Sequence, residues 1–290
     1  MAELKEYLAE VARLTDAKLD ELLCEHNEYL QSIHGVMRYS TFAGGKRIRP
    51  ALLMAAFDAS GGRFGDDTAL LACSAIEMFH TFSLMHDDLP CMDDDDFRRG
   101  KPTAHKAYSE ALAVLGGDGL CIFAFECLTR TRRLDIIAEI AQALGTKGMI
   151  GGQVVDIESE GKAVDRRTVE YIHRNKTAAL ITASVRTGAL LADARGDQLE
   201  ALSRYGREVG LAFQIVDDIL DEEGTTEQLG KDAGSDRDRG KATFPSACGM
   251  EESKTVANRL IEQAHQSLSV FGDEGALLRQ LAEYIRTRIS

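Results

Sequence analysis

The chain has 290 residues, a formal net charge of −13, four prolines and no tryptophan. The absence of a Pro- or Ser-rich linker and of any shift in composition predicts one large domain over residues 1–290. The negative charge argues against nucleic acid or an anionic membrane as partner, because both would be repelled. An anionic ligand must therefore be met by local cations or metal ions.

Six cysteines in a chain of this length, with no basic-then-apolar leader at its start, indicate a soluble protein of the reducing cytoplasm. Cys121 and Cys127 lack the CxxC spacing of a zinc site. No apolar run approaches the roughly 20 residues needed to span a bilayer. Abundant Ala, Leu and Glu with few alternating β-branched runs predict an all-α fold.

The apolar pattern predicts the helices in chain order. Leucines at helical spacing over residues 4–23 indicate an amphipathic first helix before Gly35. The glycine pair at 44–45 then breaks the chain, and Pro50 fits the first turn of the next helix.

Further glycines predict the later boundaries. GGRFG at 61–65 is typical of a turn, and Asp66 is a plausible cap for a helix that runs toward Pro90. The pair at 116–117 is expected to separate two helices, as are the glycines between 145 and 148.

The second half of the chain is predicted to be helical from Asp165, with Gly188 and Gly196 as interruptions. Residues 222–245 form a charged, glycine-rich segment that is expected to be irregular, either disordered or a lid. The last 40 residues return to an amphipathic helical pattern.

The stretch HDDLPCMDDDDFRRG at 86–100 follows the apolar run IEMFHTFSLM, so its aspartates lie at the end of a buried helix rather than in a solvated acidic loop. Crowded carboxylates raise one another's pKa unless a cation neutralises them, and hard oxygen ligands without His or Cys suit Mg²⁺ rather than zinc. Because Pro90 disturbs the helical geometry, spacing alone does not choose between Asp93 and Asp94 as the partner of Asp87.

A second acidic motif, DDILD, occupies residues 217–221. Asp217 and Asp221 are four residues apart, which places them on one helix face about 6 Å apart. The preceding GLAFQIV is apolar, so this helix is expected to be buried. If the two motifs face one another, they hold several Mg²⁺ ions and a polyphosphate.

Scattered cations complete the pattern: GGKRIRP at 44–50, Arg98, Arg99, Lys176, Lys231 and Lys241. Arg and Lys are the usual ligands of phosphate oxygens, although each alone is typical of a surface charge. A P-loop is excluded, because Ala242 stands where Ser or Thr must bind Mg²⁺ and no GxGxxG occurs.

Together these motifs resemble the trans-isoprenyl diphosphate synthases, most closely the bacterial-type farnesyl diphosphate synthases. The similarity also includes GGDGL, GGQVVDI, RNKTAALI, FQIVDDILD and LGKDAGSDRDRGKATFP, and runs from residue 44 to about 247. It implies the type I isoprenoid synthase fold, an all-helical bundle around a deep cavity, in a homodimer. The implied reaction condenses isopentenyl diphosphate with dimethylallyl and geranyl diphosphate to give (E,E)-farnesyl diphosphate.

The resemblance also implies the roles of individual residues. Mg²⁺ would be the cofactor, as three ions with substrate bound, ligated by Asp87, Asp93 and Asp217, with Asp88, Asp94 and Asp221 in support. The allylic diphosphate would be held by Arg98, Lys176, Lys231 and Lys241, and isopentenyl diphosphate by Lys46, Arg49, His80 and Arg99. Lys176, Thr177 and Gln214 would be catalytic, the last two beside the reacting carbon. No side chain is nominated as base, since the departed diphosphate is expected to take the proton.

Product length is predicted from Phe82 and Ser83, which lie one turn, roughly 6 to 8 Å, below Asp87 on about the same face. A ring there would close the floor of the cavity, and by the resemblance an aromatic residue suggests a C15 product. The alternative is that Phe82 only packs into the core.

Four other functions stay open. A geranylgeranyl diphosphate synthase of the same family would give a C20 product. A class I terpene cyclase is disfavoured by DDILD and by the second set of phosphate ligands, and a hydrolase with an HD pair at His86 and Asp87 leaves DDILD unexplained. A non-catalytic subunit would be expected to have lost an aspartate or arginine.

Overall fold

The structure is a computed structural model that describes residues 2–24, 27–223 and 239–287. Most of these residues are helical, and the strands among them form a single antiparallel pair of two residues each, which confirms the all-α class. They group into two compact units. The N-terminal unit comprises Ala2–Ala51 and Gly65–Ile137, and the C-terminal unit comprises Leu52–Phe64 and the described part of Ala138–Ser290.

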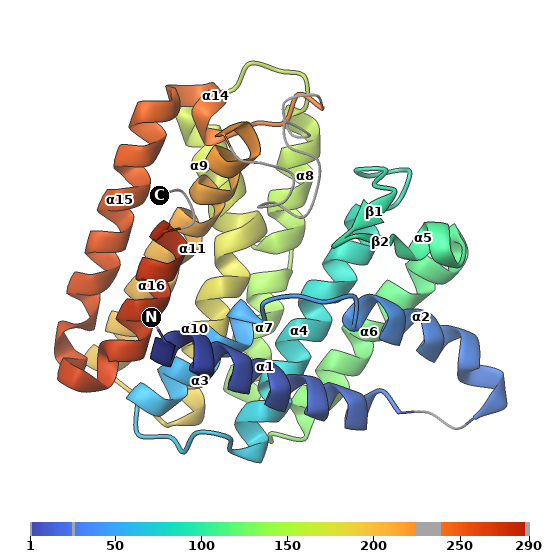
Figure 1. The fold of residues 1–290 in the computed structure, drawn as a ribbon, viewed down its shortest axis with the longest axis horizontal. Helices are drawn as coiled ribbons and strands as arrows, with labels where there is room; N and C mark the ends of the chain where they lie inside the picture. The colour runs from blue at the N-terminus through green and yellow to red at the C-terminus, as the bar shows by residue number, and fades with distance from the viewer. Residues whose placement is uncertain (1, 25–26, 224–238, 288–290) are drawn as a thin grey trace. The chain divides into compact units, whose positions relative to one another are not determined.

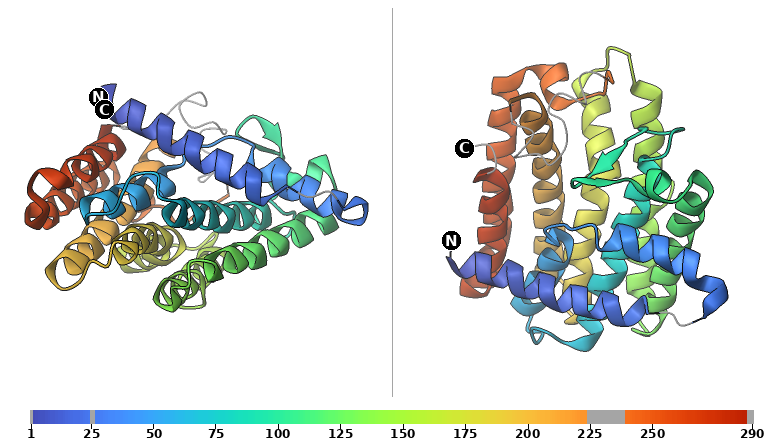
Figure 2. Two further views of the ribbon diagram at one scale, coloured as in Figure 1. Left: turned by 90° about the horizontal axis from the view of Figure 1, so that it is seen from below. Right: turned by 45° about the vertical axis from the view of Figure 1, so that its right-hand side comes forward.

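The N-terminal unit is built around two long helices that lie side by side, α4 and α6 (Figure 1). Its elements are α1 (Ala2–Leu22), η1 (Glu28–Leu30), α2 (Gln31–Thr41), α4 (Asp67–Asp87), β1 (Phe97–Arg98), β2 (Lys101–Pro102), α5 (Ala104–Ala107) and α6 (Glu110–Thr129). Helix α1 lies across α4 rather than along it (Figure 2). Asp66 caps α4 as expected, since its side chain accepts from the N–H groups of Thr68 and Ala69.

Two expected helix boundaries in this unit differ from the structure. The region before Gly44 holds two α-helices joined by η1, where the side chain of Asn27 caps the turn by accepting from the N–H of Tyr29. Gly117 lies inside α6 instead of between helices, because a Cβ there would lie within van der Waals distance of the His86 ring on α4. This glycine serves close packing of two helices rather than a turn.

Two described helices are long and apolar enough, by length and composition alone, to span a membrane. They are α4 and α6, so the expectation that no such segment exists was wrong: both tolerate a few polar residues within an apolar average. In α4, 78% of the most apolar window is buried inside the protein, as is typical of a core helix. In α6 the buried share is 39%.

The C-terminal unit is arranged around α11, which packs against both α10 and α15 (Figure 1). Its elements are α8 (Met149–Ser159), α9 (Arg166–Ile172), the π-helical turn η2 (His173–Ala178), α10 (Ala179–Leu191), α11 (Asp197–Glu223), α14 (Phe244–Cys248), α15 (Met250–Ser267), η3 (Leu268–Gly275) and α16 (Ala276–Arg286). Helices α3 (Ile48–Ala59) and α7 (Leu134–Leu144) contribute residues to both units. The fully buried Tyr205 fixes α11 by donating its hydroxyl hydrogen to the carbonyl of Leu278 at 2.6 Å.

The expected helix after Asp165 and the amphipathic C-terminal helices are present. Gly188 is inside α10 rather than at a boundary, because the helix approaches the backbone of Leu53 too closely for a side chain. Of the segment expected to be irregular, residues 224–238 lie outside the described residues.

Candidate active site

The first aspartate-rich motif begins where α4 ends, at Asp87. The chain then folds back on the helix end: the N–H of Asp93 donates to the carbonyl of Asp87 at 2.8 Å, and that of Asp94 donates to the carbonyl of Leu89 at 3.1 Å. Asp93 is half-buried and Asp94 is exposed. Spacing alone did not choose between Asp93 and Asp94 as the partner of Asp87. The backbone hydrogen bond shows that Asp93 is the one that folds back to Asp87.

The end of α4 concentrates negative charge, because the helix dipole adds to that of its carboxylates. Asp88 is 4% exposed, and burial raises the pKa of its carboxyl although Arg98 opposes the shift. Arg98 donates to Asp88 Oδ1 at 2.6 Å and to Asp95 Oδ2 at 3.2 Å. Arg98, expected to hold the allylic diphosphate, is thus engaged by aspartates in this structure.

These carboxylates fit a magnesium site by their chemistry. The expected ligands Asp87 and Asp93 offer only hard oxygen atoms, which Mg²⁺ prefers over nitrogen and sulfur. Both belong to the crowded end of α4, where one guanidinium group, Arg98, already balances part of the charge. A divalent cation would compensate the remainder.

The motif GGKRIRP and Arg99, more than 50 residues apart in sequence, meet in the N-terminal unit. A guanidinium nitrogen of Arg99 donates to the carbonyl of Gly44, and a Cβ on Gly45 would lie 2.6 Å from that group. The glycine pair therefore admits Arg99 to the loop that carries Lys46 and leads to Arg49 in the first turn of α3. This grouping agrees with the expected site for isopentenyl diphosphate.

Arg47 anchors this loop, a role that sequence reasoning missed. Its side chain is 4% exposed and donates to Asp16 Oδ1, to Glu77 Oε2 and to the carbonyl of Thr41, each at 2.8 Å. Its backbone is left-handed, with φ of 47°. Because a buried guanidinium without these partners would be costly, the network fixes the loop between Lys46 and Arg49. The arginine stands within GGKRIRP, but spacing gave no sign of its buried partners.

A small pocket in the same unit opens beside Arg98 and Arg99. Its lining includes Tyr39, Ser40, Thr81, Leu84, Met85, Asp88 and Thr103. The two guanidinium groups and the hydroxyl groups beside them provide hydrogen-bond donors suited to phosphate oxygens.

His80 is half-buried among the cations of this unit. Burial, followed by the charges of Arg49 and Arg99, lowers the pKa of its imidazole well below the ordinary value. The side chain is therefore neutral near pH 7 and adds hydrogen-bonding capacity without further positive charge.

Phe82 and Ser83 occupy different surroundings on α4. Phe82 is 8% exposed, and its ring makes edge contacts with Phe79 at 6.4 Å and with His86 at 5.8 Å between centroids. Ser83 is half-buried and donates its hydroxyl hydrogen to the carbonyl of His80 at 2.9 Å. At 3.6 residues per turn, Ser83 lies about 40° around the helix from Asp87 and Phe82 about 140°, so the expectation that both share the face of Asp87 is wrong for Phe82.

The second motif lies near the C-terminal end of α11. Asp217 is half-buried, and Asp218 and Asp221 are each 2% exposed. One continuous helix carries all three. This confirms that Asp217 and Asp221, four residues apart, lie on one helix face.

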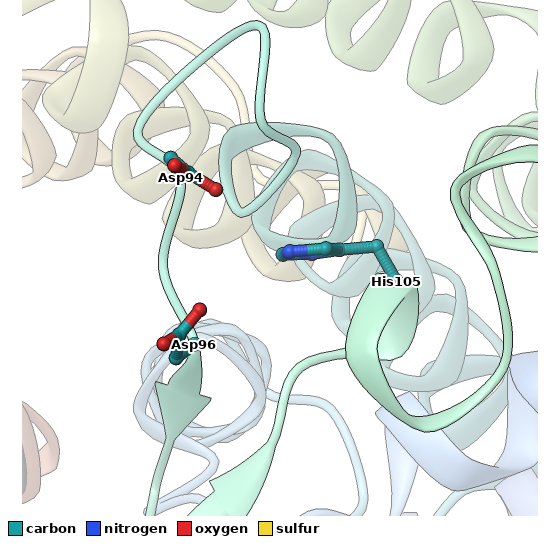
Figure 3. Close-up of side chains that lie close together, drawn as sticks. All are labelled: Asp94, Asp96 and His105. Carbon is teal, nitrogen blue, oxygen red and sulfur yellow. The ribbon is translucent and has the colours of Figure 1, made fainter.

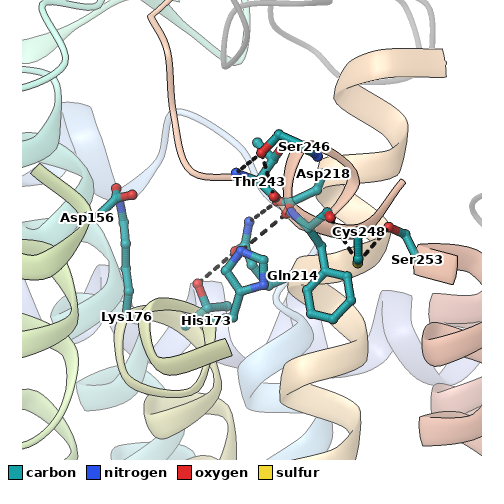
Figure 4. A network of polar contacts seen from close by, with 11 residues as sticks. Asp156, His173, Lys176, Gln214, Asp218, Thr243, Ser246, Cys248 and Ser253 are labelled. Carbon is teal, nitrogen blue, oxygen red and sulfur yellow. Dashed lines mark hydrogen bonds and ion pairs between the residues drawn. The ribbon is translucent and has the colours of Figure 1, made fainter. Parts of the chain in front are cut away.

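Asp218 organises a buried network that the sequence did not reveal (Figure 4). Its Oδ1 accepts from Gln214 Nε2 at 3.0 Å, and its Oδ2 accepts from the backbone N–H of Phe244 at 2.7 Å and lies 3.2 Å from His173 Nε2. Gln214 Oε1 in turn accepts from the hydroxyl of Thr177 at 2.7 Å. The expected pair Thr177 and Gln214 is thus brought together and oriented by Asp218.

Asp156, also missed, joins two of the expected phosphate-binding lysines, and Figure 4 shows its contact with one of them, Lys176. Lys176 Nζ lies 2.7 Å and Lys241 Nζ lies 3.5 Å from Asp156 Oδ2, and Lys241 also donates to Glu160 at 2.7 Å. Asp156 is 5% exposed and belongs to GGQVVDI, so the motif was visible although the role was not. A Cβ on Gly152 would lie 2.3 Å from the backbone nitrogen of Lys176, so this glycine permits η2 to pack on α8.

The expected site residues that the structure describes are thus divided between the two units. The N-terminal unit holds Lys46, Arg49, His80, Phe82, Ser83, Asp87, Asp88, Asp93, Asp94, Arg98 and Arg99, and the C-terminal unit holds Lys176, Thr177, Gln214, Asp217, Asp221 and Lys241. Lys231 lies outside the described residues.

The lowered pKa of His80 predicts a pH-dependent stability. An unfolded histidine titrates near 6.5, so below that pH the unfolded chain binds a proton that the folded chain refuses. The contribution of His80 to the free energy of unfolding is fully present above about pH 6.5, and it decreases as the pH drops toward the pKa of the folded state. Urea unfolding at pH 7.5 and 5.5 should show the wild type losing about 1 kcal/mol more than His80→Asn. Equal losses in both proteins would contradict this account.

Known proteins are similar to this chain over most of its length. The profile of the polyprenyl synthetase family matches residues 30–274. A dimethylallyltranstransferase of Fischerella ambigua is 45% identical over 293 residues, covering 98% of this chain and 84% of that protein. A chloroplastic geranylgeranyl pyrophosphate synthase of Capsicum annuum is 46% identical over 98% of this chain and 78% of its own length.

A solved structure shows the same fold. The apo FPP/GFPP synthase from Zymomonas mobilis is 38% identical, with a TM-score of 0.88 over 98% of this chain and 99% of that one. The two acidic motifs, the cationic groups around them and the family match over most of the chain lead to one conclusion. The chain belongs to the polyprenyl synthetase family and is a trans-prenyltransferase.

Proposed function

We propose that the enzyme is a Mg²⁺-dependent farnesyl diphosphate synthase, which condenses isopentenyl diphosphate with dimethylallyl and then geranyl diphosphate. The observation that carries this proposal is that each acidic helix end is accompanied by cations held by buried carboxylates, Arg98 by Asp88 and Lys176 by Asp156. Such preorganised charge suits substrates that carry diphosphate groups.

In the proposed reaction, the carbon–oxygen bond of the allylic diphosphate breaks and leaves a delocalised carbocation. Bound Mg²⁺, up to three ions, would neutralise the leaving diphosphate. Lys176 and Lys241 would hold its oxygen atoms, while Thr177 and Gln214, oriented by Asp218, face the cation with oxygen atoms. The double bond of isopentenyl diphosphate forms the new carbon–carbon bond, and a proton passes to the departed diphosphate.

Isopentenyl diphosphate would bind in the N-terminal unit. Lys46, Arg49 and Arg99 supply the positive charge, and the neutral His80 donates a hydrogen bond. Arg47 contributes by fixing the loop between the first two of these residues rather than by touching the substrate.

The C15 product is supported by the bulk of Phe82 on α4, five residues before Asp87. A geranylgeranyl diphosphate synthase is the second candidate. It is favoured by relatives that bear this name, including those of Capsicum annuum and Cyanophora paradoxa. The two proposals share every residue role except that of Phe82.

We also propose a cytoplasmic homodimer. The free thiols include Cys73, Cys91, Cys121, Cys127 and Cys248, as is typical of a reducing compartment. Helix α6 is strongly apolar yet largely unburied, with Leu115 55% and Ile122 69% exposed. Such an apolar face is typical of a protein interface, and a second copy of the chain is the partner that the family resemblance supports.

A condensation assay tests the proposed reaction. With Mg²⁺, isopentenyl diphosphate and dimethylallyl diphosphate, mass spectrometry after dephosphorylation should show a C15 alcohol that disappears when EDTA removes the metal. A C20 alcohol would replace the first candidate by the second. Release of diphosphate from the allylic substrate alone would contradict both.

Phe82→Ala is expected to shift the product toward C20, because it removes the ring that limits the growing chain. The matched control is Phe271→Ala in the C-terminal unit, since Phe271 is 6% exposed and Phe82 is 8% exposed. Both variants should lose about 3 kcal/mol of stability, but only Phe82→Ala should lengthen the product. Unchanged product length in Phe82→Ala would leave Phe82 a core residue only.

Light scattering coupled to gel filtration tests the homodimer. The wild type should have twice the mass of the 31.7 kDa chain. Ile122→Glu should yield monomer, because it places a charge in the proposed interface, whereas Tyr29→Glu at an 88% exposed position should leave the dimer intact. A monomeric wild type would contradict the proposed homodimer and its interface on α6.

A further inference from the structure

A cluster of three potential metal ligands lies in the N-terminal unit, and only one of its members, Asp94, was expected to take part in magnesium binding, in a supporting role. It consists of Asp94, Asp96 and His105, whose ligand atoms all lie within 4.8 Å of one another. The expected magnesium ligands of this unit, Asp87 and Asp93, are not members. Figure 3 shows the far edge of the His105 ring directed at the gap between the two carboxylates.

His105 is the member that points to a ligand. The residue is 8% exposed, and its Nε2 has no hydrogen-bond partner among the described residues. A buried ring nitrogen without a hydrogen-bond partner is costly, so a group that satisfies it would be favoured.

The partner of the other ring nitrogen determines the tautomer. Thr103 Oγ1 donates its only hydrogen to a backbone carbonyl, that of Asp95 at 2.7 Å. Toward His105 Nδ1, at 3.1 Å, the same oxygen must then act as acceptor. Nδ1 therefore carries a hydrogen, and in the neutral imidazole Nε2 presents its lone pair to the aspartates. Metal-bound histidines have this arrangement, with the second nitrogen donating to an oxygen.

The local backbone fixes the three ligands. The β1–β2 pair brings Asp96 and Thr103 together, and the N–H of Thr103 donates to the carbonyl of Asp96 at 3.0 Å. Thr103 is also the N-cap residue of α5, which carries His105. Asp96 and His105 thus belong to one hydrogen-bonded turn, and Asp94, two residues before Asp96, is held by its N–H bond to the carbonyl of Leu89, so the three need no large rearrangement to meet an ion.

The donor set selects the kind of ion. One imidazole nitrogen with two carboxylate oxygens suits a borderline divalent cation such as Zn²⁺ or Co²⁺, while Mg²⁺ prefers oxygen ligands alone. Lys106 would compete with a metal ion for Asp96, because its Nζ lies 2.7 Å from Asp96 Oδ1. We propose that Asp94, Asp96 and His105 form a second metal site, distinct from the magnesium ligands, for a borderline divalent cation. This proposal does not depend on the proposed function.

Titration of the substrate-free, full-length protein with Co²⁺ in millimolar Mg²⁺ tests the site. The Mg²⁺ occupies oxygen-only ligands, and the visible absorption of Co²⁺ distinguishes nitrogen and oxygen ligands from cysteine thiolates. We expect one Co²⁺ per chain without a thiolate charge-transfer band. His105→Gln should weaken binding by about tenfold or more.

Two further variants separate ligation from folding. Lys106→Gln should tighten Co²⁺ binding, because it frees Asp96 from its ion pair, an effect that damage to the fold would not produce. His265→Gln is the matched control, since His265 lies 3.4 Å from Glu283 in the C-terminal unit, and it should bind Co²⁺ like the wild type. Binding weaker than about 1 mM, or equal affinity in wild type and His105→Gln, would overturn the proposal.

Discussion

The accumulation of carboxylates at the ends of buried helices is the constraint on which the rest of the structure depends. Asp87 and Asp217 each lie near the negative end of a helix dipole, where further negative charge is unfavourable. Burial of Asp88 adds to the cost, and Arg98 offsets only part of it. Folding therefore leaves these helix ends short of positive charge, which is the property that recruits metal ions and the diphosphates they accompany.

Residues that need not touch a substrate hold the cations in position. Arg47 fixes the loop of Lys46 and Arg49, Asp156 joins Lys176 to Lys241, and Asp218 orients Gln214. Each of these three is buried and has several partners, so each is costly to replace even though its contacts are internal. Preorganisation of this kind lets the site meet charge that develops during the reaction without first rearranging.

The sequence predicted what depends on local pattern: the helical class, the caps and the identity of the acidic motifs. It failed where a neighbour from another part of the chain decides. Gly117 was predicted to be a helix boundary because no residue near it in sequence shows that His86 packs against it. The role of Asp156 was missed because its partners Lys176 and Lys241 lie far away in the sequence. The choice between Asp93 and Asp94 likewise required the backbone turn that returns Asp93 to Asp87.

The same turn shows how one acidic stretch can serve two kinds of ion. Asp93 and Asp94 are neighbours, yet their surroundings differ: one returns to the oxygen-only end of α4, and the other, with φ of 50°, belongs to the cluster that contains His105. Hard and borderline cations are separated by ligand type more than by affinity alone. A run of like charges that composition treats as uniform is therefore divided by backbone direction into chemically different sites.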